Sequence, residues 1–290
     1  MMRGFIPKCL ITALVMMIAY SMIVPRVMPK WKTWQSQGQT NVIKAQRYLY
    51  DGVKYDAVIL GSSLCTRLAN DSLPEEVCNL GFGGQGVQDG LNVIARRGYA
   101  PKLVAMEINF IFRPENRNFE NSVLSPAFYH LRELVPALRD EYQPIGLVKG
   151  WASARTEAKR KASPPVPLGH SQRDAVFLKM LDIQQKDLAI VPKNEEIDSI
   201  MSRLKRMTDE LERQGTRIVL FEMPMDPSLT ELPYPRATRE AFARWYPTEN
   251  YARIPSPDIS GYGSTDGLHL DAASAAAFTA DLRGALMKFR

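Results

Sequence analysis

The stretch that most constrains the fold of this chain is DAVILGSSLCTRL, residues 56–68. Its first part, AVIL, is a short apolar run rich in branched side chains, which predicts a strand buried inside a parallel sheet. A glycine breaks the run, and Ser62 and Ser63 follow it directly. Either serine is able to cap a helix, which we expect to begin near Leu64 and to end before Pro74.

The position of these serines also has a functional interpretation. A serine at the carboxyl end of a strand and at the start of a helix lies where open α/β sheets bind their ligands. The unpaired N–H groups of a helix N-terminus are also able to bind an oxyanion. The stretch alone leaves both interpretations open, because serine caps that only start a helix are common.

Three further apolar runs predict strands, at residues 77–80, 101–108 and 217–223. A glycine-rich turn, GFGGQG at residues 81–86, precedes an expected helix at 87–97, and an amphipathic helix is expected at 195–214. Strands that alternate with helices indicate a parallel sheet with right-handed crossovers. We therefore expect an α/β protein with three α/β/α layers and a mostly parallel sheet.

A long helical and loop insertion, about residues 111–199, is expected after the third strand, because no clear strand pattern occurs there. Residues 116–122 are rich in asparagine and are interpreted as loop, whereas residues 127–138 are interpreted as helix. Residues 151–173 are first basic and then proline-rich, which predicts a loop.

The N-terminal segment is the second constraint on the chain. Residues 9–24 are apolar and uncharged, and with flanking residues up to Met28 they are long enough to cross a bilayer. We expect residues 1–28 to be an uncleaved membrane anchor, with a cleaved signal peptide as the alternative. Residues 29–52 are then a linker and a packing helix, and residues 53–290 form the main domain. Basic residues on both sides of the apolar run leave its orientation open.

The charged residues and cysteines exclude some classes of function. The chain of 290 residues has a formal net charge of +6, but its basic residues are dispersed apart from one local cluster around residues 155–161, and no zinc-ligand spacing or aromatic ladder occurs. No nucleic-acid partner is therefore predicted, and the mild positive charge fits a protein close to anionic lipid. Cys65 and Cys78 are able to pair in an oxidising compartment or to remain buried thiols. No metal site and no cofactor are predicted.

Among the three histidines, His269 is the one whose neighbours suggest chemistry. His130 lies in a helical pattern and His170 in the predicted loop, so both are interpreted as structural or solvated. His269 ends the sequence DGLH, which begins at Asp266. An aspartate at this spacing is able to accept the Nδ1–H of the imidazole and leave Nε2 facing a nucleophile. The alternative is a polar loop that only starts a helix, and we interpret Asp271 as the helix-start residue.

These features occur in an order that suits a serine enzyme. Ser63 follows the first strand, the glycine turn follows the second, Asn109 follows the third, and Asp266 and His269 precede the last helix. Because the ends of parallel strands share one edge of the sheet, these residues are able to meet. A serine nucleophile needs a base, a group that orients the base, and oxyanion donors. Ser63 Oγ should then lie roughly 2.6–3.2 Å from His269 Nε2.

At this point the chain resembles the SGNH, or GDSL-like, hydrolase superfamily. The Gly-Asp-Ser-Leu block of that family appears as GSSL, with Ser63 in the place of the nucleophile, and its Asn-x-Gly-x-x-Gly block appears as NLGFGG, with Gly84 in the place of the oxyanion glycine. Its Gly-x-Asn-Asp block is reduced to EINF, which keeps Asn109, and its Asp-x-x-His block matches DGLH. The resemblance implies that Ser63, Asp266 and His269 are catalytic. It also implies an oxyanion hole formed by the N–H groups of Ser63 and Gly84 and the amide of Asn109.

Two departures refine the resemblance. Ser62 and Phe110 stand where the family has aspartates, which is similar to its membrane-anchored branch, the branch of the D-alanyl-lipoteichoic acid and alginate-acetylation proteins. That branch implies a serine esterase or O-acyltransferase acting on acyl esters, chiefly acetyl esters, of cell-envelope polysaccharide or a related glycan. It further implies a single-pass protein of the inner (cytoplasmic) membrane, with its catalytic domain on the periplasmic or extracytoplasmic side.

The same resemblance suggests partners and leaves two questions open. An acylated glycan or acyl donor is the expected ligand, and a multi-spanning membrane acyltransferase is an expected protein partner. Hydrolysis and transfer share one acyl-enzyme, so the sequence does not choose between them. Because the third block is eroded, the alternative is a catalytically inactive assembly component that kept the fold.

Overall fold

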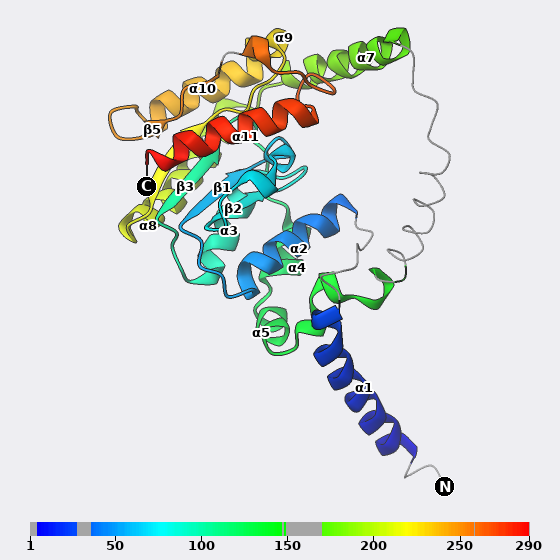
Figure 1. Cartoon of the computed structure of the whole chain (residues 1–290). Helices are drawn as coiled ribbons and strands as arrows, with labels where there is room; N and C mark the ends of the chain where they lie inside the picture. Colours follow the sequence, from blue (N-terminus) through cyan, green and yellow to red (C-terminus); the bar gives the residue numbers. More distant parts are fainter. Residues whose placement is uncertain (1–4, 28–35, 147, 149–169, 258, 290) are drawn as a thin grey trace. The chain divides into compact units, whose positions relative to one another are not determined.

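The computed structural model describes residues 5–27, 36–146, 148, 170–257 and 259–289 (Figure 1). The chain divides into two compact units. The first unit comprises Met1–Asp51 and Asn118–Pro167, and the second comprises Gly52–Arg117 and Leu168–Arg290. The sheet and all the residues of the candidate site belong to the second unit.

The second unit contains one sheet whose strands are all parallel. Its order is β2-β1-β3-β4-β5, and the strands are β1 Ala57–Gly61, β2 Val77–Gly81, β3 Leu103–Glu107, β4 Arg217–Phe221 and β5 Ala252–Arg253. This is the flavodoxin-like order, in which the chain changes direction across the sheet between β1 and β3. The predicted α/β fold with three layers and a parallel sheet is confirmed.

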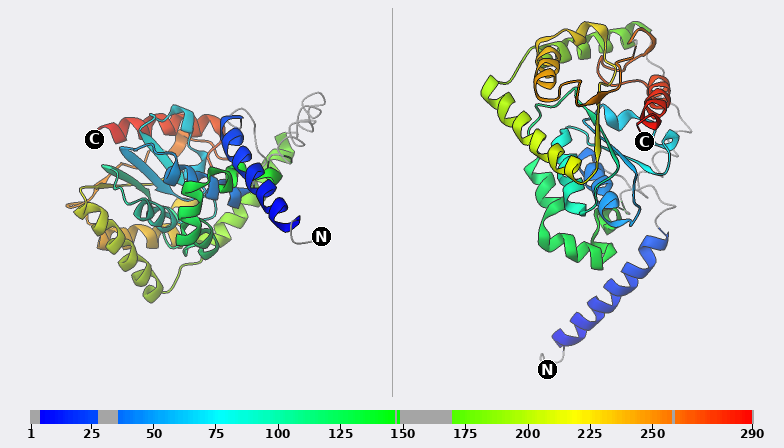
Figure 2. Two further views of the ribbon diagram at one scale, coloured as in Figure 1. Left: turned by 90° about the horizontal axis from the view of Figure 1, so that it is seen from below. Right: turned by 90° about the vertical axis from the view of Figure 1, so that its left-hand side faces the viewer.

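Helices cover both faces of this sheet. Figure 2 shows α8, Asn194–Arg213, on one side of the sheet and α11, Ala272–Met287, on the other. Helix α3, Val87–Arg97, packs on β1 and β2. Gly90 permits this close packing, because a Cβ atom there would lie 2.6 Å from Leu60 Cδ2. Both faces of the central strands are therefore buried, which explains why they are continuously apolar.

The helix expected after β1 is not formed, and this prediction is wrong. Residues 62–76 contain two 3-10 helices instead, η3 Cys65–Arg67 and η4 Asn70–Ser72. In an α-helix, the N–H of Ala69 would donate to the carbonyl of Cys65. Here Ala69 N–H donates to Thr279 Oγ of α11 at 2.9 Å, and the Cys65 carbonyl accepts from Asn79 Nδ2 at 2.8 Å. Two side chains distant in sequence thus replace the helical hydrogen bond.

Between β3 and β4, the described residues form helices and no strand, as expected for the insertion. Besides α8, they include α4 Arg117–Leu124, α5 Pro126–Leu134 and α7 His170–Leu188. The loop expected at residues 116–122 is wrong, because α4 buries Phe119 and Val123 on one face. The loop expected at 151–173 lies outside the described residues up to 169, and its last residues belong to α7.

The first unit contains the N-terminal helix α1, Phe5–Val27, and α2, Gln37–Tyr50. Within α1, residues 5–24 are long and apolar enough to cross a membrane. Helix α2 begins where Ser36 Oγ accepts from Gln39 N–H. Later in the same unit, α5 is followed by two 3-10 helices, η5 Pro136–Leu138 and η6 Asp140–Tyr142. Helix α2 contacts η6, and Gln46 Nε2 donates to Asp140 Oδ2 at 2.5 Å.

After β4, the described residues form further helices. The short helix α9, Pro227–Thr230, is capped by Asp226, and α10, Pro233–Trp245, packs on α8. The turn η7, Ile259–Gly261, then leads into the loop that precedes α11. Asp271 caps α11 by accepting from Ser274 N–H at 2.8 Å, so its interpretation as a helix-start residue is confirmed.

Candidate active site

The two serines after β1 have different surroundings. Ser62 is buried, its N–H donates to Glu107 Oε2 at 2.6 Å, and its Oγ accepts from Leu64 N–H at 3.2 Å. Ser62 is therefore the residue that shapes the turn. Ser63 is half-buried, and among the described residues none accepts a hydrogen bond from its N–H. Its N–H is therefore available at the carboxyl edge of the sheet.

The loop before α11 holds Asp266 and His269 in one arrangement. His269 Nδ1 lies 2.7 Å from Asp266 Oδ2. The other carboxylate oxygen accepts from the N–H of His269 at 2.7 Å and from that of Leu268 at 3.1 Å. The main chain of Thr265 donates to the His269 carbonyl at 2.8 Å, which closes the loop on itself. Buried Leu268 fixes this loop to the core.

The residue that follows β1 and the loop that precedes α11 meet in space. Ser63 Oγ lies 3.0 Å from His269 Nε2, although 206 positions separate the two residues in the sequence. This distance falls within the range expected from the sequence. Ser63, His269 and Asp266 thus form a continuous chain of hydrogen bonds, with the imidazole between a hydroxyl and a carboxylate.

The electrostatics of this chain follow from the loop geometry. Partial burial alone raises the pKa of Asp266, but hydrogen bonds from the ring and main chain of His269 and from Leu268 N–H outweigh it and hold that pKa at about 2. Asp266 is therefore ionised at neutral pH and accepts the Nδ1–H of His269. The lone pair of Nε2 then faces the Ser63 hydroxyl, which is the arrangement that a general base requires.

Gly84 lies in the glycine turn after β2. It is exposed and has a φ of 73°, a left-handed conformation that favours glycine. The turn is held by Phe82 N–H, which donates to the Gly61 carbonyl at 2.9 Å at the end of β1. Among the described residues, the Gly84 N–H donates to no acceptor. Its amide is therefore available to a ligand, as its expected role requires.

Asn109 has a different environment from the one expected of an oxyanion donor. It is buried, its Nδ2 donates to the Met223 carbonyl at 3.0 Å, and its Oδ1 accepts from Met223 N–H at 2.8 Å. The side chain thus joins the end of β3 to the end of β4. An amide nitrogen carries two N–H bonds, and the Met223 carbonyl takes one of them.

Glu107 is a residue that the sequence analysis did not select. It ends β3, is 1% exposed, and its carboxylate accepts from Ser62 N–H. Burial raises the pKa of Glu107 in spite of that hydrogen bond and of the nearby Arg113 guanidinium. The signal was present in the sequence PKLVAMEI, where one acidic residue interrupts an apolar strand.

Cys65 lies beside this carboxylate and fits between two glycines. A Cβ atom at Gly61 would lie 2.3 Å from Cys65 Sγ, and one at Gly81 would lie 2.5 Å from Cys65 Cβ. These two glycines are paired in register at the ends of β1 and β2. Cys65 is buried and Cys78 partly buried, and no disulfide bond joins them.

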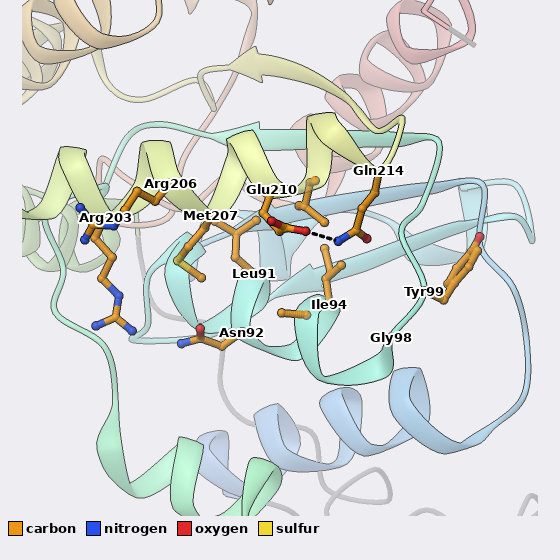
Figure 3. A pocket seen from close by; sticks show the side chains of 12 residues that line it. Leu91, Asn92, Ile94, Gly98, Tyr99, Arg203, Arg206, Met207, Glu210 and Gln214 are labelled. Carbon is orange, nitrogen blue, oxygen red and sulfur yellow. Dashed lines mark hydrogen bonds between the residues drawn. The ribbon is translucent and has the colours of Figure 1, made fainter.

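The remaining histidines lie elsewhere. His130 is exposed on α5, with Nδ1 3.6 Å from Glu133 Oε2, and His170 is the first residue of α7. A cavity of about 650 Å³ lies between α3 and α8, and Leu91, Met207 and Arg203 are among the residues that line it (Figure 3). Ser63, Asp266 and His269 do not line this cavity.

In comparisons with family models, with curated proteins and with solved structures, no match to this chain was found.

Proposed function

We propose that this protein is a serine acyl-transfer enzyme, an esterase or O-acyltransferase. The observation that carries the proposal is the contact between Ser63 Oγ and His269 Nε2 at 3.0 Å, together with Asp266 Oδ2 at 2.7 Å from Nδ1. A nucleophile, a base and a group that orients the base are the parts that covalent acyl transfer needs. The position of the three residues at the carboxyl edge of a parallel sheet supports the same proposal.

In the first half of the proposed reaction, Ser63 Oγ attacks the carbonyl carbon of an acyl ester while His269 Nε2 accepts the hydroxyl proton. The C–O bond of the ester then breaks, and His269 passes the proton to the departing alcohol. In the second half, water or a sugar hydroxyl gives its proton to His269 and attacks the acyl-enzyme. The acyl group leaves Ser63, which recovers its proton. Asp266 stays ionised and stabilises the imidazolium.

The negative charge that develops on the carbonyl oxygen needs donors. The N–H groups of Ser63 and Gly84 support this role, since both are available, and the second N–H of the Asn109 amide is the third proposed donor. Loss of one such donor typically costs about 3 kcal/mol of transition-state stabilisation. Because Asn109 is already bound to Met223, we assign the larger share of the oxyanion stabilisation to the N–H groups of Ser63 and Gly84.

The substrate and location are proposed from the resemblance to the membrane-anchored SGNH proteins and from α1. We infer that α1 anchors the chain in the cytoplasmic membrane with the second unit on the extracytoplasmic side. The proposed ligand is an acyl ester, chiefly an acetyl ester, of an envelope polysaccharide or related glycan. A multi-spanning membrane acyltransferase is the proposed partner that supplies the acyl group.

One observation favours a second candidate, an inactive assembly component with the same fold. The Asn109 amide is used to join β3 and β4, and the sequence around it lacks the other residues of the family's third block. A fluorophosphonate probe, which modifies activated serines, separates the two candidates. The adjacent serine provides a matched control, because Ser62 is buried and accepts from Leu64 N–H.

The proposed enzyme predicts that the wild-type chain and Ser62→Ala are labelled, whereas Ser63→Ala and His269→Ala are not. Absence of labelling in a folded wild-type chain would favour the assembly component. Labelling that persists in Ser63→Ala would place the reactive serine elsewhere and reject the assignment.

A further inference from the structure

The first unit exposes a series of large apolar side chains in one short region. We call residues 126–146 together with Val148 the α5–η6 segment. Helix α5 buries none of its residues completely, and Leu134 at its end is 79% exposed. The exposed apolar side chains of the segment are Phe128, Leu131, Leu134, Leu138, Ile145 and Val148. A water-soluble surface seldom concentrates so many large apolar side chains.

Both arginines of the same segment are mostly buried. The side chains of Arg132 and Arg139 are only 13% and 12% exposed. Arg132 Nη2 lies 3.4 Å from Asp140 Oδ2, and Arg139 Nη1 lies 3.6 Å from Asp51 Oδ1. Among the charged side chains of the segment, Glu133 is the exposed one, at 61%, beside exposed His130. Pairing of buried arginines within the protein is the behaviour expected where the surroundings are hydrocarbon.

The segment also contacts the helix that is able to cross a membrane. Helix α1 packs on η5, and the Tyr20 hydroxyl donates to the Tyr142 carbonyl. Val24, at the end of the apolar stretch, is 9% exposed, whereas most of α1 before Tyr20 is exposed. Figure 1 shows α5 beside the C-terminal end of α1.

These contacts set the depth of the segment relative to α1. Tyr20 is four residues before Val24, the last residue of the apolar stretch. At a rise of 1.5 Å per residue, Tyr20 lies roughly 6 Å inside the end of that stretch. Interfacial helices bury their apolar faces about 5–10 Å into the boundary between headgroups and acyl chains. The contact with Tyr142 therefore holds the α5–η6 segment at this depth.

We propose that the α5–η6 segment is a lipid-contacting surface that lies in the membrane interface beside α1. This inference rests on the proposed role of α1 as a membrane anchor. The six exposed apolar side chains enter the acyl-chain boundary, and the pairs Arg132–Asp140 and Arg139–Asp51 stay within the unit. The first unit then has two attachments to the bilayer, α1 and the α5–η6 segment, which restrict how this unit tilts and rotates on the membrane.

Tryptophan fluorescence in lipid vesicles that contain brominated phosphatidylcholine tests this proposal, with the full-length chain and no other protein present. Three variants are compared with the wild-type chain: Leu134→Trp in the segment, Leu14→Trp in α1, and Met287→Trp, an exposed apolar position on α11. All three positions are exposed, so the substitutions leave the core intact. The measured quantity is the fraction of the added fluorescence that the bromine atoms quench.

We expect Leu134→Trp and Leu14→Trp to be quenched at least about twofold more than Met287→Trp, because bromine quenches only tryptophans that contact the acyl region. Quenching of Leu14→Trp without quenching of Leu134→Trp would overturn the lipid-contacting surface while leaving the anchor intact, and the apolar face would then fit a protein partner. Absence of quenching at both positions would reject the anchor itself.

Discussion

The N–H of Ser62 donates to the buried carboxylate of Glu107 at 2.6 Å, which ties the end of β1 to the end of β3. These are the two strands between which the sheet order reverses, and Ser63 is the next residue along the chain. Glu107 therefore helps to fix the turn that presents Ser63.

The first prediction concerns the two replacements Glu107→Gln and Glu107→Ala. Glutamine keeps an oxygen that accepts from Ser62 N–H, whereas alanine leaves that buried N–H without its acceptor, which costs about 1–3 kcal/mol. We expect Glu107→Ala to lower the free energy of unfolding by at least this amount, and Glu107→Gln to keep it at or above the wild-type value. Denaturant titration at neutral pH measures both, and equal losses in the two variants would contradict the hydrogen-bond role.

The pH dependence of stability gives Glu107 a second signature. Because burial raises its folded-state pKa, the unfolded chain releases this proton at lower pH than the folded chain does. The protonated carboxyl of Glu107 therefore contributes fully to the free energy of unfolding below the pKa of the unfolded state. This contribution declines as pH rises through the pKa of the folded state. Glu107→Gln should remove this decline. Unfolding free energies measured across the acid-to-neutral range would show parallel curves for wild type and variant if this account is wrong.

The second prediction concerns the close packing at the ends of β1 and β2. A Cβ atom at Gly61 would lie 2.3 Å from Cys65 Sγ and 2.7 Å from Glu107 Oε2. We expect Gly61→Ala to destabilise the protein by roughly 1–3 kcal/mol and to lower the activity by displacing Ser63. Gly284→Ala on α11 is the matched control, since nothing lies within 4 Å of a Cβ atom there. It should be neutral or stabilising; similar thermal shifts in both variants would refute the packing argument.

The third prediction concerns Asp266→Asn. An asparagine amide facing Nδ1 favours the wrong imidazole tautomer, and in a related triad this change lowers kcat about 10⁴-fold. We expect a loss of this order in ester hydrolysis by the variant. Asp271→Asn keeps a helix cap and should retain activity, since Asp271 accepts from Ser274 and not from His269. Steady-state rates of both variants are measured. Equal losses of rate in Asp266→Asn and Asp271→Asn would mean that Asp266 acts only through folding.

Asp266 also affects stability in acid. Its folded-state pKa, about 2, lies below the usual value of 3.8. The carboxylate therefore stabilises the fold at pH above about 4, and this contribution disappears as pH falls from about 4 to about 2. The acid-unfolding curve of Asp266→Asn should lack this component. Identical acid-unfolding curves for the variant and the wild-type chain would contradict the assigned pKa.

Much of the sheet and of the hydrogen-bonded site could be predicted from sequence because the signals are local. Apolar runs that end in glycine or polar residues marked the strands, and the spacing of Asp266 and His269 predicted their hydrogen bond. The parallel sheet then brings the end of β1 close to the final loop. No long-range information was needed beyond the order of strands and helices.

What the sequence did not reveal depends on partners far along the chain. Asn79 and Thr279 take the hydrogen bonds that an α-helix after Ser63 would have made, so that turn became two 3-10 helices. Asn109 is held by Met223, 114 positions away. The composition of residues 116–122 predicts a loop. These residues form most of α4 instead, because burial of Phe119 and Val123, at helical spacing, stabilises a helix.

The most direct test of the proposed function is to trap the acyl-enzyme. The wild-type chain and Ser63→Ala are incubated with an activated acyl ester, quenched in acid, and analysed by mass spectrometry of the intact chain and its peptides. The account predicts a mass increase of one acyl group on the wild-type peptide that contains Ser63, and none on the variant. An unmodified folded wild-type chain, or an acyl group carried by a residue other than Ser63, would contradict it.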